Sequence, residues 1–211
     1  GIRTELAVSA NQPTWVYALV AASGGGLDGI YKSTNSGTSY TKVFDGTTSG
    51  NNLLGWNCSG SGSGGQGSYD LCIATDPTNA NNVYVGGVNT WKSTNGGSSW
   101  SIVNHWTGCG TPYAQNVHAD KHFLTFQNGT STIFEANDGG LYKSSDGGTT
   151  WAHLSSGMAI SQIYRLGVGQ TNPDEVIIGL QDNGTKALLS GVWNDVIGGD
   201  GFECIVDYTD E

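Results

Sequence analysis

Short apolar runs, rich in aromatic and β-branched residues, alternate with polar turns in which Gly, Asn, Asp and Ser recur. Typical runs are 15–20, 83–86 and 176–180. Runs of this length and composition, bounded by turn residues, are typical of β-strands. No apolar pattern with a period of 3.6 residues continues for more than a couple of turns. The pattern therefore predicts an all-β fold.

One nine-residue pattern occurs three times, at 32–40, 92–100 and 143–151, and reads Lys-Ser-x-(Asp/Asn)-x-Gly-x-(Ser/Thr)-aromatic. Asp or Asn followed two residues later by Gly is typical of a hairpin turn, since Gly takes the positive φ that the turn needs. A short strand precedes and follows each copy, so each is predicted to be a β-hairpin whose last aromatic covers the turn. The defining residues are Ser33, Asn35, Gly37 and Tyr40; Ser93, Asn95, Gly97 and Trp100; and Ser144, Asp146, Gly148 and Trp151.

The repeated pattern resembles the Asp-box or BNR repeat, Ser-x-Asp-x-Gly-x-Thr-Trp. The third copy matches it completely, whereas the first two carry Asn for Asp and the first ends in Tyr. The resemblance is to a family that includes sialidases, sortilin-type receptors, xyloglucan-cleaving glycosidases and a photosystem assembly factor. It is closest to secreted bacterial BNR-repeat proteins with the segments found here at 181–185 and 198–201. It implies a β-propeller of four-stranded antiparallel blades, with the box as a structural turn at the blade periphery.

The spacing of the boxes predicts the domain organisation. Their Asx residues lie 60 residues apart (35 to 95) and then 51 apart (95 to 146). At this period the chain holds blades at about 3–44, 69–104, 118–155 and 160–197, and 202–211 begins a fifth. Propellers generally close at about 4–8 blades, and the resemblance implies six to eight or more. We therefore predict a single segment of a larger propeller, with its open edge covered by the rest of that propeller or by a second chain.

Composition narrows the range of partners. The net charge is −10 with only eight Lys plus Arg, which argues against nucleic acid and anionic membranes as partners. No apolar run approaches the roughly 20 residues of a membrane span. The low charged fraction, with abundant Ser, Thr, Asn and Gly, suits a secreted or cell-surface protein.

Four cysteines are present, none with the spacing of a metal-binding pair. Cys58 and Cys109 lie in Gly-rich loops between blades that are expected to emerge on the same face, which favours a disulfide between them. The rival pairing is Cys58 with Cys72. Cys72 and Cys204 fall inside apolar strands, and we expect them to be buried thiols that act as small hydrophobic residues.

The segment His118-x-Asp120-x-His122 opens the first strand of the third blade. Alternation along an extended strand would place these three side chains on one face. Two imidazoles and a carboxylate are suited to zinc binding or to acid–base chemistry. The structural alternatives are a polar patch that contacts ligand and a hydrogen-bonded cluster that fixes the inner strand.

Other candidate residues lie in turns and loops. Gln181, Asp182 and Asn183 form a turn, and Asp200 precedes the last predicted inner strand. Asp120 and Asp200, from different blades, are the candidate catalytic pair, because glycosidases use two facing carboxylates. We predict no cofactor, although acidic turns such as 137–140 are of the kind that holds calcium. Trp56 and Trp106, in loops between blades, are candidates for stacking on a sugar ring.

These residues favour an extracellular binding or scaffolding propeller that recognises a glycan or a protein at its mouth. The alternative is a polysaccharide hydrolase resembling the xyloglucanase-type propellers, which pair Asp residues from two propellers. A sialidase is disfavoured, because the resemblance implies several Arg residues and the chain has only Arg3 and Arg165. The sequence identifies no substrate.

Overall fold

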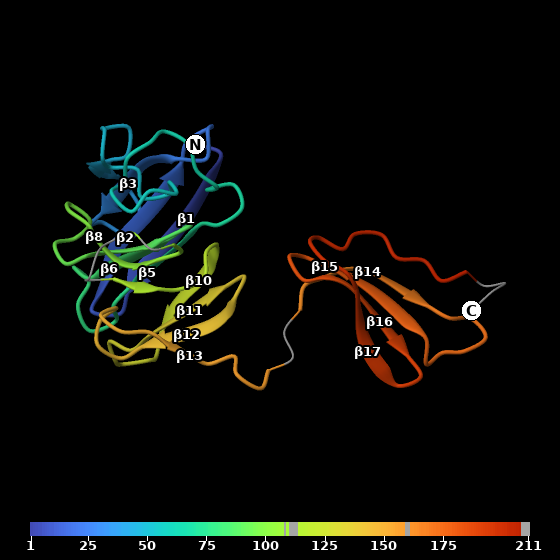
Figure 1. Cartoon of the computed structure of the whole chain (residues 1–211). Coiled ribbons are helices and arrows are strands. Elements are labelled where there is room, and N and C mark those ends of the chain that lie inside the picture. The colour runs from blue at the N-terminus through green and yellow to red at the C-terminus, as the bar shows by residue number, and fades with distance from the viewer. Residues whose placement is uncertain (108, 110–113, 159–160, 208–211) are drawn as a thin grey trace. The chain divides into compact units, whose positions relative to one another are not determined.

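The computed structural model describes residues 1–107, 109, 114–158 and 161–207 (Figure 1). The chain folds into two compact units, Gly1–Ser156 and Gly157–Glu211, and each is described by itself. Every regular element in the described ranges is a β-strand, so the predicted all-β class is confirmed. The described residues contain no helix that is long and apolar enough to cross a membrane.

The first unit contains three sheets, and the first four strands of each run antiparallel in chain order like a propeller blade. The first is β1 (Arg3–Ser9), β2 (Gln12–Ala21), β3 (Leu27–Ser33) and β4 (Thr41–Asp45). The second is β5 (Cys72–Thr75), β6 (Val83–Gly86), β7 (Thr90–Ser93) and β8 (Ser101–His105), followed by β9 (Gln115–Asn116). The third is β10 (Lys121–Phe126), β11 (Ile133–Asn137), β12 (Gly140–Ser144) and β13 (Ala152–His153).

The strand β9 differs from the sequence prediction, which treated 105–116 as a loop. Gln115 and Asn116 pair in parallel with Asn104 and His105 of β8 and extend the second sheet to five strands. Two polar residues are too few to show the alternation by which a strand is predicted from sequence. The strand β9 forms because Gln115 and Asn116 lie beside β8 and run in the same direction, so their backbone groups find hydrogen-bond partners there.

The core of the first unit lies between neighbouring blades. The first strands of the three sheets lie side by side, and β5 contacts both β1 and β10. One apolar cluster joins the first two sheets and includes Tyr17, Leu19, Ile30, Val85 and Trp91. A second joins the second and third sheets and includes Tyr84, Val117, Leu124, Ile133 and Trp151. Because the second sheet packs between the other two, its strands β5 and β6 are buried on both faces.

The second unit contains one further four-stranded antiparallel sheet. Its strands are β14 (Ile163–Val168), β15 (Val176–Leu180), β16 (Gly184–Leu189) and β17 (Val192–Ile197), again in chain order. The chain thus forms four blade-like sheets, three in the first unit and one in the second, and its fold is that of a β-propeller segment. The side chains of β17 are exposed throughout.

The predicted first strand of a fifth blade, 202–211, does not form over the described residues 202–207. Instead this segment lies on its own sheet, where Phe202 stacks on Tyr164 with ring centroids 5.2 Å apart and Cys204 is buried. A strand needs a neighbouring strand to pair with, and residues 202–207 take part in no strand pairing within the described part of the chain. Residues 208–211 lie outside the described part.

Candidate ligand-binding site

The three Asp boxes have one geometry. Each Ser hydroxyl accepts a hydrogen bond from a Gly N–H at 2.8–2.9 Å and donates to the Asn or Asp side-chain oxygen at 2.8–3.0 Å. Trp100 and Trp151 donate their indole N–H groups to the carbonyls of Gly97 and Gly148. Hydrogen bonds lower the pKa of Asp146 to about 2, and the bond from the Thr150 hydroxyl makes the largest contribution. The polar groups of the boxes are therefore engaged within their own turns.

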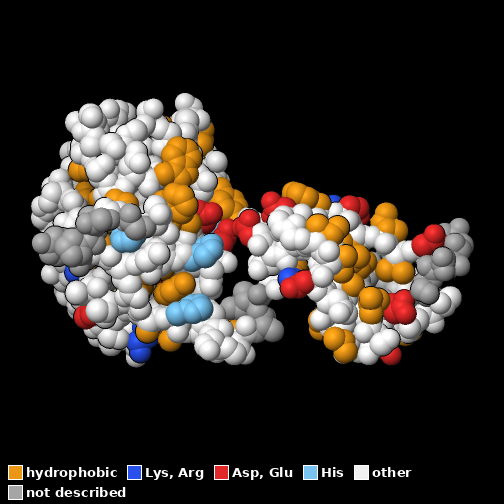
Figure 2. Space-filling view, in the orientation of Figure 1, with side chains coloured by type: hydrophobic (Ala, Val, Ile, Leu, Met, Phe, Trp, Pro, Cys, Tyr) orange, Lys and Arg blue, Asp and Glu red, His pale blue; other side chains and the backbone are white. Residues whose placement is uncertain are grey.

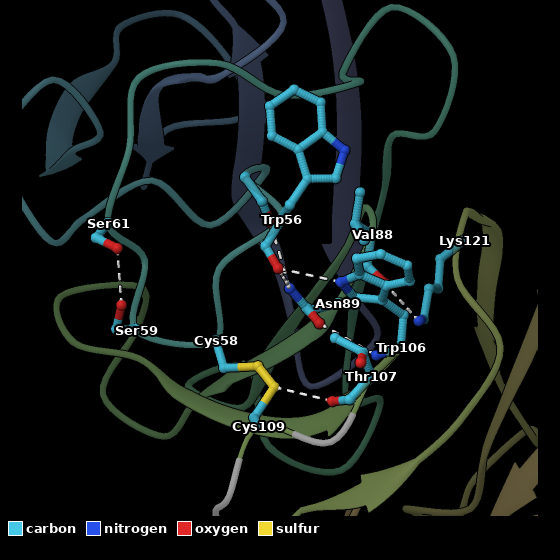
Figure 3. Close-up of a disulfide and its surroundings, with 11 residues drawn as sticks. Trp56, Cys58, Ser59, Ser61, Val88, Asn89, Trp106, Thr107, Cys109 and Lys121 are labelled. Carbon is cyan, nitrogen blue, oxygen red and sulfur yellow. Dashed lines mark hydrogen bonds between the residues drawn. A yellow bond between two sulfur atoms is a disulfide. The ribbon is translucent and has the colours of Figure 1, made fainter.

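A disulfide joins Cys58 to Cys109, with the two Cα atoms 6.0 Å apart, and confirms the preferred pairing (Figure 3). Cys72 and Cys204 are free and buried, as predicted, so the rival pairing of Cys58 with Cys72 is wrong. The disulfide ties the long loop after the first blade to the loop after the second. Trp56 and Trp106 lie close to it, one on each of these loops.

Hydrogen bonds hold Trp56 and Trp106 together on the surface. The Trp106 indole N–H donates to the Trp56 carbonyl at 3.1 Å, and Asn89 bridges the two backbones (Figure 3). The side chains remain 46 and 42% exposed. The Trp56 indole N–H points to Gln66 Oε1 at 3.5 Å, and the Gln66 amide donates to Asp120 Oδ1 at 2.9 Å. A polar connection therefore runs from the Trp56 indole through Gln66 to Asp120.

The structure does not place His118, Asp120 and His122 on one face of a strand. Asp120 has a φ of 61°, in the left-handed region, and β10 begins only at Lys121. The pairing with β11 then shifts register between Lys121 and Phe123. Alternation holds only along a continuous extended strand, so the left-handed residue and the bulge redirect the three side chains.

His122 forms a second polar group together with two residues that the sequence analysis did not pair with it. Its Nε2 lies 2.7 Å from Asp138 Oδ1, and the Tyr69 hydroxyl donates to Asp138 Oδ2 at 2.9 Å. The Tyr69 ring meets the His122 imidazole edge-on, with centroids 4.8 Å apart. His118, in contrast, contacts the neighbouring Ala119 carbonyl. In Figure 2, histidine side chains lie on the surface of this unit among hydrophobic ones.

Asp70 is the functional candidate that sequence reasoning missed. Its side chain is fully buried, and neither carboxyl oxygen has a hydrogen-bond partner. The Gln66 amide and the Asp120 carboxyl lie beside it, but neither makes a hydrogen bond of good geometry. Burial, reinforced by the negative charge of Asp120, raises the pKa of Asp70 to about 8. An acid immediately before the apolar run 71–74 was the only sequence signal.

Two other buried charges nearby are fully satisfied. Lys121 donates to the Val88 carbonyl at 2.7 Å and to the His118 carbonyl at 2.8 Å, while burial lowers its pKa. Glu135 accepts from Thr90, Asn104 and Asn137 at 2.6–3.1 Å. These groups form a polar core between the second and third blades, and the Lys121 charge interacts electrostatically with Asp70 and Asp120.

The candidates of the second unit belong to one turn. The backbone N–H of Asp182 donates to Asp200 Oδ1 at 2.9 Å, and the Asn183 amide donates to the Gln181 carbonyl at 3.0 Å. Asp200 therefore caps this turn. Because Asp120 and Asp200 belong to different units, their pairing in catalysis stays a prediction. No group of three or more His, Cys, Asp or Glu side chains suited to a metal occurs in the described residues.

No protein-family model matches the chain, and no curated protein matches it either. Among solved structures, it is similar to a GH74 enzyme of Niastella koreensis (22% identity, 91% of this chain and 29% of that one, TM-score 0.49). It is also similar to the GH74 xyloglucanase of Xanthomonas campestris (19%, 93 and 31%, TM-score 0.47).

A further similar structure is PorZ, a surface component of the type-IX secretion system of Porphyromonas gingivalis (13%, 87 and 32%, TM-score 0.44). The chain spans 29–32% of the length of these three chains. The propeller assignment rests on the chain's own blade-like sheets, and in structure the chain is similar to these larger proteins.

Proposed function

We propose that this protein is an extracellular binding module that recognises a glycan through the surface of Trp56, Trp106, Tyr69, His122 and Asp120. We call these five residues the aromatic–acid surface. The observation that carries the proposal is the pair of half-exposed indoles, held by hydrogen bonds and connected through Gln66 to a carboxylate. Indole faces stack on the apolar faces of sugar rings, and carboxylates accept hydrogen bonds from sugar hydroxyls.

Charge and redox chemistry refine this proposal. The net charge of −10 disfavours polyanionic glycans and therefore favours neutral ones. The Cys58–Cys109 disulfide suits a secreted or cell-surface protein, because disulfides persist in oxidising compartments. A protein ligand at the same surface is the competing outcome.

The test is binding to a panel of neutral polysaccharides, including xyloglucan, mixed-linkage glucan, galactomannan and xylan, by affinity electrophoresis. Trp56→Ala and Trp106→Ala are each expected to weaken retention about tenfold, since stacking of one aromatic is worth about 1–1.5 kcal/mol. Trp193→Ala removes an indole of similar exposure from the second unit and is the matched control. Absence of retention on every polysaccharide, or equal loss in the control, would contradict the proposal.

A second candidate function is polysaccharide hydrolysis, favoured by the raised pKa of Asp70 beside Asp120. Perturbed carboxyl groups at a ligand-binding surface are typical of catalytic sites. Asp120→Asn would then abolish the release of oligosaccharides, measured by mass spectrometry, while retention on the polysaccharide persists. Oligosaccharide release that is unchanged in Asp120→Asn, or that is absent from the wild type, would contradict the hydrolase hypothesis.

A further inference from the structure

The buried carboxyl group of Asp70 lies beside a second acid, Asp120. Both of its oxygens lack a partner, and it is the only buried carboxyl group of the described residues in this condition. An ionised carboxylate without a counter-charge or donor costs several kcal/mol to bury. The carboxyl group of Asp70 is therefore stable in this position only when it keeps its proton or when a cation lies between or beside the two acids.

No Lys or Arg of the described residues makes a hydrogen bond or ion pair with Asp70, and the buried Lys121 ammonium acts on Asp70 and Asp120 only through longer-range electrostatics. Arg3 turns to the backbone carbonyls of Ser68, Tyr69 and Leu71 and to Glu5, and none of its contacts is with Asp70. The Lys121 ammonium group is directed to two carbonyls, those of Val88 and His118. Glu135 is satisfied by neutral donors from Thr90, Asn104 and Asn137. Gln66 donates its amide hydrogen to Asp120 Oδ1.

We propose that Asp70 and Asp120 together bind a divalent cation of the calcium class at the base of the aromatic–acid surface. Carboxylate oxygens are hard ligands that favour calcium or magnesium over softer metals. Calcium completes its shell with neutral oxygens and water, so two carboxylates suffice as the charged ligands. Asp120 is half-buried, which gives the cation a route from the surface to Asp70.

The environment of Asp120 fits this role. Gln66 donates to one carboxylate oxygen, Oδ1, which leaves Oδ2 available to a ligand. The pairing with Gln66 also connects the site to the Trp56 indole, whose N–H lies 3.5 Å from the Gln66 carbonyl oxygen. A bound cation would therefore lie close to a tryptophan, which makes terbium a direct probe. The proposal does not depend on glycan binding.

The experiment is a Tb³⁺ titration of EDTA-treated protein with excitation of tryptophan, followed by competition with CaCl₂. We expect saturable terbium emission in the wild type, reversal by calcium, and a rise in the melting temperature with calcium. Asp70→Asn and Asp120→Asn keep the side-chain shape and are each expected to lower the affinity at least about tenfold. Asp45→Asn, an exposed acid of the same unit, is the control and should bind like the wild type.

Two results would overturn the proposal. One is wild-type emission that does not saturate or that calcium does not reverse. The other is equal affinity in Asp70→Asn and wild type, which would mean that Asp70 holds only a proton. If Asp70→Asn does not fold, Asp120→Asn and the effect of calcium on wild-type melting decide the question. Polysaccharide retention measured in EDTA separates this result from the glycan proposal.

Discussion

At the scale of single residues, the boxes show how one turn accepts two side-chain chemistries. Asn35 and Asn95 accept the backbone N–H of Ser39 and Ser99 and donate their own amide N–H to the same residue's hydroxyl. Asp146 accepts both groups of Thr150. The turn therefore needs an acceptor oxygen at this position. The negative charge of Asp146 is not required for the turn to form.

This comparison predicts that Asp146→Asn folds normally but changes the response to acid. The pKa of Asp146 is lowered to about 2 in the folded state, from an ordinary value of 3.8. Its stabilising effect is therefore present above about pH 4 and is lost as the pH falls toward 2. Because the side chain is exposed, the effect is expected to be about 1 kcal/mol or less.

The measurement is the free energy of unfolding in urea at pH 5 and pH 2.5 for the wild type and the variant. The difference between the two proteins should be largest at pH 5 and should fall to about a third of that value at pH 2.5. Asp174→Asn in an exposed turn is the control. A difference that does not change with pH would show that the charge of Asp146 contributes nothing to the turn.

At the scale of elements, each blade contacts the turn of the next. The Tyr17 hydroxyl of β2 donates to the Ala80 carbonyl, in the loop before β6, at 2.9 Å. The Tyr84 hydroxyl of β6 and the Lys92 ammonium of β7 both donate to the Gly147 carbonyl of the third box, at 3.0 and 2.9 Å. The box turns therefore also join neighbouring blades.

We predict that Tyr84→Phe lowers the free energy of unfolding by about 1 kcal/mol, the net value of one hydrogen bond. The ring and its packing in the second core cluster are kept, and Lys92 still satisfies Gly147. Urea unfolding measures the loss. Tyr142→Phe, at a half-buried tyrosine packed against the same cluster, is the control. An equal loss of stability in both variants would mean that the Tyr84–Gly147 hydrogen bond makes no specific contribution to the free energy of unfolding.

At the scale of the whole molecule, apolar side chains remain exposed in both units. Leu6 and Val8 of β1 and Phe123 of β10 are more than half exposed in the first unit. Val192 and Ile197 of β17 are more than half exposed in the second. That further blades or a second chain cover such side chains stays a prediction.

The disulfide acts at the same scale, because it joins loops that follow different blades and are 51 residues apart. We predict that the double variant Cys58→Ser/Cys109→Ser loses up to about 4 kcal/mol, since the open loop gives the unfolded chain more conformational entropy. Urea unfolding with and without dithiothreitol measures this. The reductant should lower the stability of the wild type and leave that of the variant unchanged. An equal effect on both proteins would mean that the reductant does not act through this disulfide.

The sequence by itself determined the local features of this protein. Turn chemistry at Asn35, Asn95 and Asp146 predicted three hairpins, and their period predicted the blades, because turns and alternating strands depend on residues close together in the chain. The Cys58–Cys109 pairing followed from the positions of two loops relative to those blades.

Only the tertiary structure decided the site. The left-handed backbone of Asp120 breaks the alternation that the sequence suggested for His118 and His122. The partners of His122 and Asp120 come from segments 16 and 54 residues away, Asp138 and Gln66. The burial of Asp70 depends on packing between blades, which no local pattern specifies. Local interactions form the blades of this protein, whereas contacts between distant segments place its polar groups together, and these are visible only in the folded chain.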